Sequence, residues 1–519
     1  MSVDQISYKD LLQDPDQAEA YIQEIFAICE KNGFIHWLLS EIARESKGPE
    51  EAYPAQGLVF TGYEGFGDIE PKRDELQPQL VDTTILAWLY YLTLNNHPDR
   101  LQSLYEQSEK PFVPPQEIES PIFENARKER RAINIADLKL QVGGTDKSRR
   151  SRTELHQSGP FVSYYHPTDK EPSKGRKQAR GVIVAGANPE ITGSPFALAT
   201  LVQSHSLASV PRDGLFSKIQ RQVDLVRKTI EFLERSPMLY NKDEEERKKL
   251  LEFYTHNLVG VIEPEPKKAL KRARALYEAG IRTFRIYSPE PGNDSLRTLV
   301  DLRKAENEEG WEPIEIFVGQ VVDVEQAIAL QKAGADALYF GIGGGGRCIT
   351  GVVGGLTINW PQLVWDLRGK ISVPMLVEGG ANDYISESLT IGASGIGTVG
   401  KFGGTIETPG SIAFYIDEEG QVFKFYGGEA SDRMRVMGGR KGPFGFVLNT
   451  EGETTKKKKR NGVQRLPTLS QVLHELNQGV VAGMVFQNAG SVSELQQLAN
   501  RSLLQASPND DASRHTHNK

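Results

Sequence analysis

Along the middle of the chain, apolar positions follow two patterns that alternate, one typical of strands and one typical of helices. Short apolar runs, such as residues 283–287 and 337–340, are typical of buried strands, and residues 267–279 and 324–333 carry the period of amphipathic helices. Helix stretches end at a glycine and lead into the next strand. This alternation predicts a parallel sheet with right-handed crossovers. Six or more such units between residues 182 and 399 favour an α/β fold of the closed (β/α)8 TIM barrel type over an open sheet.

The first 125 residues follow a different pattern. Residues 21–43 and 80–105 carry helical periodicity, with Trp37 and Trp88 among the apolar positions, and strand signals are scarce. The pattern predicts a mainly helical N-terminal domain over residues 1–125. A linker leading into the barrel follows over 126–180, and its charged, serine- and proline-rich part, residues 148–180, predicts a loop. The barrel is expected over 181–506, with a flap around 432–465 and a disordered tail over 507–519.

Composition narrows the class of protein. The 519 residues are 38% hydrophobic and 25% charged, which is typical of a soluble globular protein, and the net charge of -8 argues against nucleic-acid binding. The basic run 456–460 has no interleaved aromatic residues, so a solvated flap is favoured over a phosphate clamp. No apolar run is long enough to span a membrane, and the start lacks a signal segment. With only Cys29 and Cys348, a reducing, cytoplasmic location is expected.

A glycine-rich loop ending in a thiol follows the apolar run 337–340. It reads Gly-Ile-Gly-Gly-Gly-Gly-Arg-Cys-Ile-Thr over residues 341–350 and places Cys348 on the C-terminal face of the predicted barrel, where active sites form. Glycines let the backbone approach a ligand, and a thiol beside backbone dipoles can become a nucleophile. A free cysteine is commonly a small buried side chain. The loop favours a functional thiol for Cys348, whereas Cys29 on an apolar helix face predicts a structural one.

This loop resembles the catalytic loop of the inosine-monophosphate dehydrogenase and guanosine-monophosphate reductase family, with the nucleophilic cysteine in the same eighth position. Further segments resemble the family in the same order, over roughly residues 133–500. They are 187–188 with 192–199, 374–380, 407–410, 426–431, and 473–476 with 482–484.

The resemblance implies an oxidoreductase that acts on a purine nucleotide with NAD or NADP. Cys348 would attack C2 of the base; in the dehydrogenase a hydride then leaves to the nicotinamide and water releases the product, and in the reductase ammonia leaves and hydride is delivered. Thr350 would help to activate the water or leaving group, and Glu407 would join the proton relay. From the residues alone, Glu407 could equally cap a helix beginning near Pro409. Carbonyls of Gly343, Gly345 and Cys348 would be candidate ligands for K⁺, and a homotetramer is implied.

The resemblance also assigns binding residues. Glu378 would hold the ribose hydroxyls, while the amides of Gly379, Gly380 and Gly400 and the Tyr426 hydroxyl would cradle the phosphate, because carboxylates suit diols and glycine amides suit phosphates. Asn188 and Glu429 complete the substrate set, and Ser288, Glu290 and Gln320 form the cofactor set.

Several positions depart from the family pattern. Tyr287 replaces the aspartate that normally begins the nicotinamide-contacting strand end, Glu378 replaces the ribose aspartate, and Glu429 replaces the base-contacting methionine. A charged Glu429 favours a donor-rich, guanine-like base. Residues 438–465 contain no tyrosine, the tandem regulatory module is absent, and the N-terminal domain has no recognised counterpart. Two alternatives therefore stay open: a non-redox, cysteine-dependent substitution or hydrolysis at the base, and a catalytically silent nucleotide-binding protein whose N-terminal domain contacts a partner.

Overall fold

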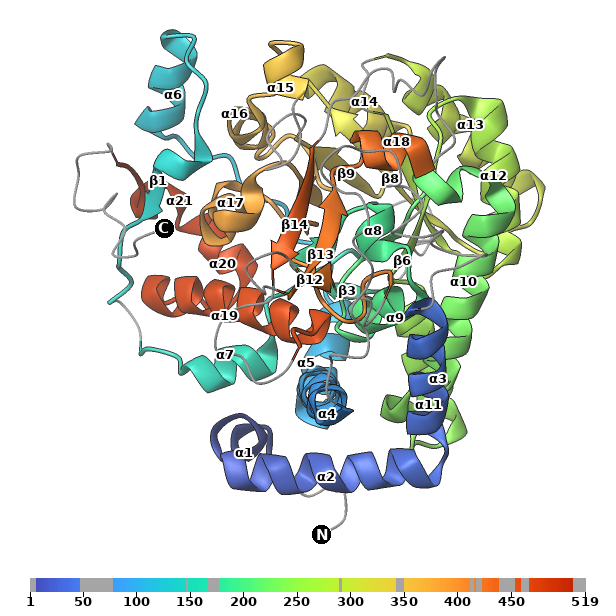
Figure 1. Ribbon diagram of the computed structural model, residues 1–519. Helices are drawn as coiled ribbons and strands as arrows, with labels where there is room; N and C mark the ends of the chain where they lie inside the picture. The colour runs from blue at the N-terminus through green and yellow to red at the C-terminus, as the bar shows by residue number, and fades with distance from the viewer. Residues whose placement is uncertain are drawn as a thin grey trace.

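Eight parallel strands close into a barrel at the centre of the molecule (Figure 1). The computed structural model describes residues 6–46, 78–145, 148–166, 177–288, 292–341, 350–410, 415–416, 422–437, 453–458 and 466–506. The barrel strands are β4 (Ile183–Ala185), β5 (Ala208–Val210), β6 (Leu258–Ile262), β7 (Thr283–Tyr287), β8 (Glu315–Val321), β9 (Ala337–Phe340), β10 (Met375–Val377) and β11 (Gly395–Thr398). β11 pairs with β4 and closes the ring, so the predicted (β/α)8 fold is confirmed.

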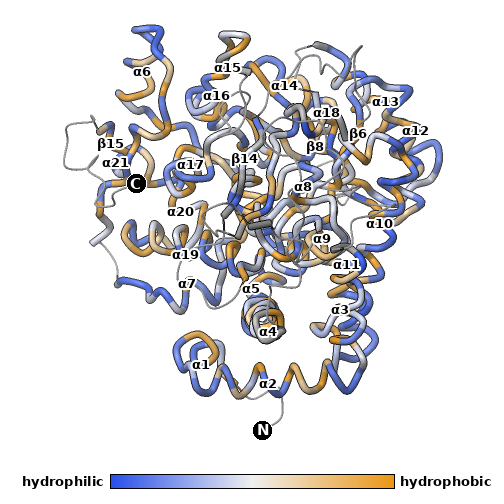
Figure 2. Tube along the Cα trace, in the orientation of Figure 1, coloured by the Kyte–Doolittle hydropathy of each residue, from blue (hydrophilic) through white to orange (hydrophobic). Residues whose placement is uncertain are grey.

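Helices that follow the strands form the outer layer of the barrel. They are α9 (Pro195–Gln203), α10 (Ile219–Glu234), α12 (Pro266–Glu278), α13 (Asp294–Glu308), α14 (Val324–Lys332), α16 (Trp360–Asp366), α17 (Ile385–Ile391) and α19 (Leu469–Gln487). The predicted start of α14 is confirmed, because the Asp323 side chain accepts a hydrogen bond from the Gln326 amide at 2.7 Å. Polar and apolar residues alternate along α10 and α12 (Figure 2), as expected for helices with one buried face.

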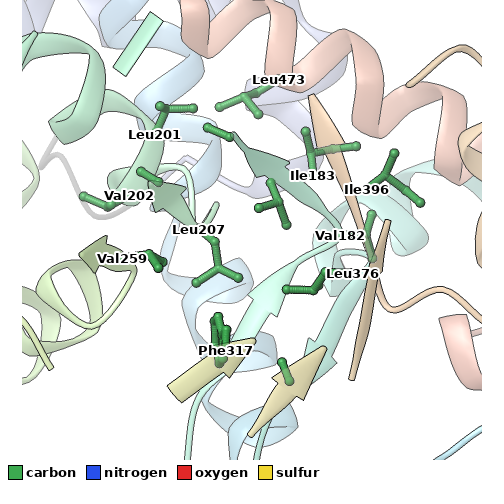
Figure 3. Close-up of a cluster of buried hydrophobic side chains, with 14 of the residues drawn as sticks. Val182, Ile183, Leu201, Val202, Leu207, Val259, Phe317, Leu376, Ile396 and Leu473 are labelled. Carbon is green, nitrogen blue, oxygen red and sulfur yellow. The ribbon is translucent and has the colours of Figure 1, made fainter. Parts of the chain in front are cut away.

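The core lies between the strands and these helices. Figure 3 shows part of it, where Leu201 of α9 and Leu473 of α19 lie near Ile183 and Ile396 of neighbouring strands. All four side chains are buried. Burying one such side chain stabilises the fold by about 1.5–3 kcal/mol, so this layer fixes the barrel on which the site is built.

The described parts of the segment 148–180, residues 148–166 and 177–180, lie at the N-terminal end of the barrel, and the prediction of a loop there was wrong in part. It contains α7 (Arg152–Ser158) and an antiparallel pair of strands, β2 (Phe161–Ser163) and β3 (Ala179–Gly181). Arg180 is fully buried and pairs with Glu315, the first residue of β8; its Nη1 donates to Oε1 at 2.9 Å. One of the charges that suggested a solvated loop, that of Arg180, is therefore paired inside the fold.

The N-terminal helices pack against the barrel and share its core. They are α1 (Tyr8–Gln13), α2 (Pro15–Lys31), α3 (Phe34–Ser46), α4 (Pro78–Asn95) and α5 (Pro98–Ser108). In Figure 1, α4 is seen end-on between α2 and the barrel. Trp88 of α4 packs edge-on against Phe196, with ring centroids 5.3 Å apart, and its Nε1 donates to Thr200 Oγ1 at 2.9 Å. The predicted helical character is confirmed, and the contacts join these helices to α9.

Smaller elements complete the described chain. The remaining helices are α6 (Pro121–Lys128), α8 (Pro189–Thr192), α11 (Glu244–Thr255), α15 (Thr350–Val353), α18 (Asp432–Met437), α20 (Val492–Gln497) and α21 (Ala499–Ser502), with short 3₁₀ turns at Ile135–Asp137, Gly214–Ser217, Pro237–Leu239 and Ala381–Asp383. β1 (Leu138–Leu140) pairs with β15 (Leu503–Gln505), and β12 (Tyr415–Ile416), β13 (Val422–Gly427) and β14 (Thr454–Lys458) form a sheet. Among the described residues, none of the helices has the length and apolar character needed to cross a membrane.

Candidate active site

The cysteine loop begins where β9 and β10 end side by side. Gly341 has a φ of +106°, and a Cβ at this position would come within 2.0 Å of the Glu378 carbonyl oxygen. Only glycine allows so close an approach. The loop therefore starts at the C-terminal face of the barrel, against Glu378. Cys348 itself lies outside the described residues, and Thr350 begins α15.

Glu378, the residue predicted to hold the ribose, is bound by two side chains from across the barrel. Its two carboxylate oxygens accept hydrogen bonds from Arg285 Nη1 and Nη2, each at 2.7 Å. Gln320 Nε2 donates to Oε2 at 3.0 Å. A carboxylate offers about four acceptor positions, so three are occupied and one is left for a ligand hydroxyl. The Glu378 side chain retains 19% exposure, which leaves it accessible from the mouth.

Arg285 is held in a fixed position on β7. Its guanidinium lies over the Tyr339 ring at 3.8 Å from the centroid and 4.9 Å from that of Tyr287. The side chain is 2% exposed. A buried, stacked guanidinium with a fork-like donor geometry fixes a carboxylate in one orientation, so Arg285 sets the direction in which Glu378 faces.

A pair of carboxyl groups lies beside this network. Glu429 is hydrogen-bonded to Asp213; burial, followed by the charge of Asp213, raises the pKa of Glu429 well above its ordinary value. Arg212 Nη2 lies 3.5 Å from an Asp213 oxygen, and the Arg212 guanidinium lies 5.8 Å from the Tyr287 ring centroid. Burial, followed by the charge of Glu429, also raises the pKa of Tyr287. The pair therefore offers a proton donor as well as acceptors, not only the charged acceptor expected of Glu429.

Asn188 connects the first strand of the barrel to the segment carrying Glu429. Its Nδ2 donates to the Gly427 carbonyl at 2.8 Å, and its Oδ1 accepts from the Glu190 amide at 2.8 Å. The Glu190 carboxylate accepts from the Gly427 amide and pairs with buried Arg433. Asn188 is itself buried, so the structure gives it a role in holding the strand end of β13 at the mouth.

The predicted phosphate cradle is a set of glycine turns. Gly379 and Gly380 have positive φ angles of +73° and +95°. A Cβ on Gly400 would lie 3.9 Å from the Tyr426 hydroxyl and 3.7 Å from Lys457 Nζ. Gly400 and Tyr426 are therefore neighbours, as the resemblance implies, and a lysine joins them.

Glu407 is fully buried and contacts the start of α19. Both of its carboxylate oxygens lie 2.8 Å from the Leu469 amide, which donates to them. Burial raises the pKa of Glu407 to about 7, although the Leu469 hydrogen bond and the Lys424 charge act in the opposite direction. Glu407 thus accepts a hydrogen bond from the first residue of α19, while residues 411–414, where a helix beginning near Pro409 would continue, lie outside the described chain. The catalytic role of Glu407 stays a prediction.

The residues predicted to bind the cofactor lie at the ends of β7 and β8. The Ser288 amide donates to the Gly319 carbonyl and the Gln320 amide donates to the Ser288 carbonyl, each at 2.8 Å. Gln320 Oε1 is buried and has no hydrogen-bond partner among the residues that the structure describes. Glu290 and the candidate cation ligands Gly343 and Gly345 lie outside the described residues. Within the described ranges, no group of three or more His, Cys, Asp or Glu side chains could hold a metal ion.

Sequence reasoning missed Arg285, Asp213 and Lys457. The importance of Arg285 could have been predicted, because a charged residue at the centre of the apolar run 283–287 requires a buried partner. Asp213 follows Arg212 in a connecting segment with no comparable signal. Lys457 was included in the run predicted to be a solvated flap; instead, it lies in β14, opposite β13, and is half-buried.

Comparison with known proteins identifies a family and several relatives of this chain. Residues 122–517 match the IMP dehydrogenase / GMP reductase domain. The chain is 29% identical to inosine-5'-monophosphate dehydrogenase of Chlorobaculum parvum over 238 residues, which cover 44% of this chain and 46% of the relative. It is 29% identical to that of Helicobacter pylori over 242 residues, 44% and 47% of the two chains, and 27% identical to that of Aquifex aeolicus over 255 residues, 46% and 48%. The aligned part spans a little under half of each relative.

Proposed function

Because the chain belongs to the IMP dehydrogenase / GMP reductase family, we propose that it is an oxidoreductase acting on a purine nucleotide, with Cys348 as the nucleophile at C2 of the base. The observation that carries the proposal is the approach of Gly341 to the Glu378 carbonyl. It fixes the first residue of the cysteine loop beside the backbone of Glu378, the residue whose carboxylate would hold the ribose. A ribose bound by Glu378 would bring its base to the same end of the barrel as the loop.

Each described residue would have a defined task. The remaining acceptor position of Glu378 takes one ribose hydroxyl, while Arg285 and Gln320 keep the carboxylate oriented. The amides of Gly379, Gly380 and Gly400 and the Tyr426 hydroxyl receive the phosphate. The Asp213–Glu429 carboxyl pair faces the base edge, where its donor and acceptors can read a carbonyl together with an amino or imino hydrogen.

The described residues fit a nicotinamide cofactor, NAD or NADP, at the β7 and β8 ends. Gln320 Oε1 is a buried acceptor without a partner in the described chain, and the carboxamide of a nicotinamide carries N–H donors. When bound, the nicotinamide supplies the acceptor or donor of a hydride at C2. Gln320 would orient the ring, and Ser288, fixed by its backbone hydrogen bonds to β8, would border it.

In the dehydrogenase reaction, the Cys348 sulfur would form a bond to C2, C2 would lose its hydrogen as a hydride for which the oxidised nicotinamide is the acceptor, and water would then displace the sulfur and leave an oxygen on C2. In the reductase reaction, which starts from a base with an amino group on C2, the sulfur would displace ammonia, and a hydride for which the reduced nicotinamide is the donor would then displace the sulfur. Thr350 and Glu407 are proposed to move the protons of the water or ammonia; a carboxyl group with a pKa of about 7 can both accept and donate a proton at neutral pH. No step is assigned to K⁺. The proposed assembly is a homotetramer in the cytoplasm.

The test is to incubate the protein with IMP or GMP and each oxidised or reduced nicotinamide, and to follow the absorbance of the reduced form. We expect turnover that is abolished in Cys348→Ala and preserved in Cys29→Ala, the matched control. Consumption of nucleotide without nicotinamide turnover would replace the redox step by a cysteine-dependent substitution or hydrolysis. Binding without consumption would indicate the silent nucleotide-binding protein, and light scattering checks the tetramer.

A further inference from the structure

Lys457 extends along the glycine turn at the end of β11. A Cβ on Gly403 would lie 2.9 Å from Lys457 Cγ, and one on Gly404 would lie 3.2 Å from Lys457 Cβ. At the far end, Lys457 Nζ is 3.7 Å from the corresponding position on Gly400. The lysine stem thus follows three glycines of the turn, and two of them leave room for it. The ammonium lies beside Gly400, the residue whose amide is proposed to bind phosphate.

A second lysine faces Lys457 across the strand pair. Lys424 of β13 is the direct register partner of Lys457 in β14. Side chains of directly opposed residues lie on the same face of a sheet, and like charges there are destabilising. The Lys424 ammonium is buried and donates to the Thr405 carbonyl at 2.8 Å and the Thr408 carbonyl at 3.2 Å. Lys424 thus binds residues 405 and 408, just after Gly404. The Lys457 ammonium lies near Gly400, where the glycine turn begins.

The Tyr426 side chain completes the arrangement. Lys457 Nζ lies 5.5 Å from the centroid of the Tyr426 ring, and both the ring edge and the hydroxyl of Tyr426 border Gly400. An ammonium and a phenol hydroxyl that both lie beside Gly400 form a donor set suited to an anion with several acceptor oxygens.

We propose that the Lys457 ammonium binds the phosphate group of the substrate at the Gly400 turn, and that this cation makes the pocket select a phosphate monoester over the corresponding nucleoside. The inference rests on the proposed function for the identity of the substrate, but the anion site is defined by Lys457, Gly400 and Tyr426 themselves. The lysine run that the sequence favours as a solvated flap thereby contributes one member to the binding site.

The experiment compares the intact wild-type protein with Lys457→Gln, using calorimetric titration with IMP, GMP, inosine, guanosine and inorganic phosphate. Loss of a charge-assisted hydrogen bond is expected to weaken binding of the monophosphates about 10- to 100-fold. The affinity for the nucleosides should not change, and kcat should fall much less than kcat/KM. Lys457→Arg, which keeps the charge, should recover part of the loss.

Lys401→Gln is the matched control, because it removes the same charge one residue from Gly400. Lys401 Nζ is paired with Asp383 at 2.5 Å, so this variant should bind the monophosphates as the wild type does. Thermal unfolding checks that Lys457→Gln is folded. Added phosphate should raise the Tm of the wild type more than that of Lys457→Gln.

The outcomes separate this inference from the proposed function. Equal monophosphate affinity in the wild type and Lys457→Gln would overturn the role of Lys457 and leave the proposed function intact. If the wild type binds inorganic phosphate through Lys457 but no purine monophosphate, the anion site stands and the proposed function fails. If the wild type binds neither monophosphate nor inorganic phosphate, both are overturned.

Discussion

Arg285 and Glu378 form a bidentate ion pair at the mouth of the barrel, and both N–O distances are 2.7 Å. Arg285 comes from the middle of β7 and Glu378 follows β10, so the pair connects strands that are not neighbours in the sheet. Gly397 of β11 lies directly beside the pair, since a Cβ there would be 2.4 Å from Glu378 Cγ. The proposed ribose ligand is therefore positioned by an ion pair inside the barrel.

Removing Arg285 should destabilise the fold strongly. Arg285→Ala leaves the Glu378 carboxylate half of a broken buried pair, which costs about 3–5 kcal/mol. The double variant Arg285→Met/Glu378→Leu removes both charges, so its loss of unfolding free energy should be smaller than that of Arg285→Ala. Urea unfolding followed by circular dichroism measures both. A double variant less stable than Arg285→Ala would show that the contacts of the two side chains, and not the unpaired charge, dominate.

The two cysteines should differ sharply in reactivity. Cys29 is fully buried, and burial raises its pKa to about 12, so its reactive thiolate is scarce at neutral pH. A thiol reagent at pH 8 should therefore label one cysteine rapidly in the native protein and both in denaturant. Cys348→Ala should lose the rapid phase, and Cys29→Ala should retain it. A native protein with no rapid phase would argue against Cys348 as an accessible nucleophile.

The N-terminal helices should unfold together with the barrel. Trp88 is buried between α4 and α9, where it also stacks on Phe34 of α3. Trp88→Ala should lower the free energy of unfolding by about 3–5 kcal/mol. Thr200→Val, which removes only the hydrogen-bond acceptor, should cost about 1 kcal/mol. Denaturation is followed by tryptophan fluorescence and circular dichroism, and separate transitions for the helices and the barrel would contradict a shared core.

The sequence predicts the barrel well because its periodicity is local. Strand and helix lengths, the Asp323 cap and the glycine stops are all properties of short segments, and the structure has them where the pattern predicts them. The cysteine loop is likewise predictable as the segment that follows β9, and Gly341 leaves that strand as expected.

Long-range pairing is what the sequence pattern does not contain. Arg180 reads as part of a charged, solvated segment until Glu315, 135 residues away, is brought to it. In the sequence, Lys457 is one of several equivalent lysines. Only its position opposite Lys424 in the β13–β14 pair shows on which face of that sheet its side chain lies. The sequence around Glu407 indicates only local partners, whereas its carboxylate also accepts a hydrogen bond from the Leu469 amide, 62 residues further along the chain. Charged side chains acquire their roles from partners that tertiary structure supplies.

Glu407 should make stability depend on pH. Its folded-state pKa of about 7 is above the ordinary value of 4.5, so between these values the folded protein binds more protons than the unfolded chain. Stability then falls as the pH rises through this window. Glu407→Gln cannot ionise and retains an oxygen acceptor for the Leu469 amide. The unfolding free energy of the wild type, measured relative to this variant, should therefore decrease by about 3 kcal/mol between pH 4.5 and pH 7. Urea unfolding of both proteins across this pH range measures the difference. If the unfolding free energies of the two proteins change in parallel with pH, Glu407 does not titrate in this range. It would then be unable to move protons near neutral pH.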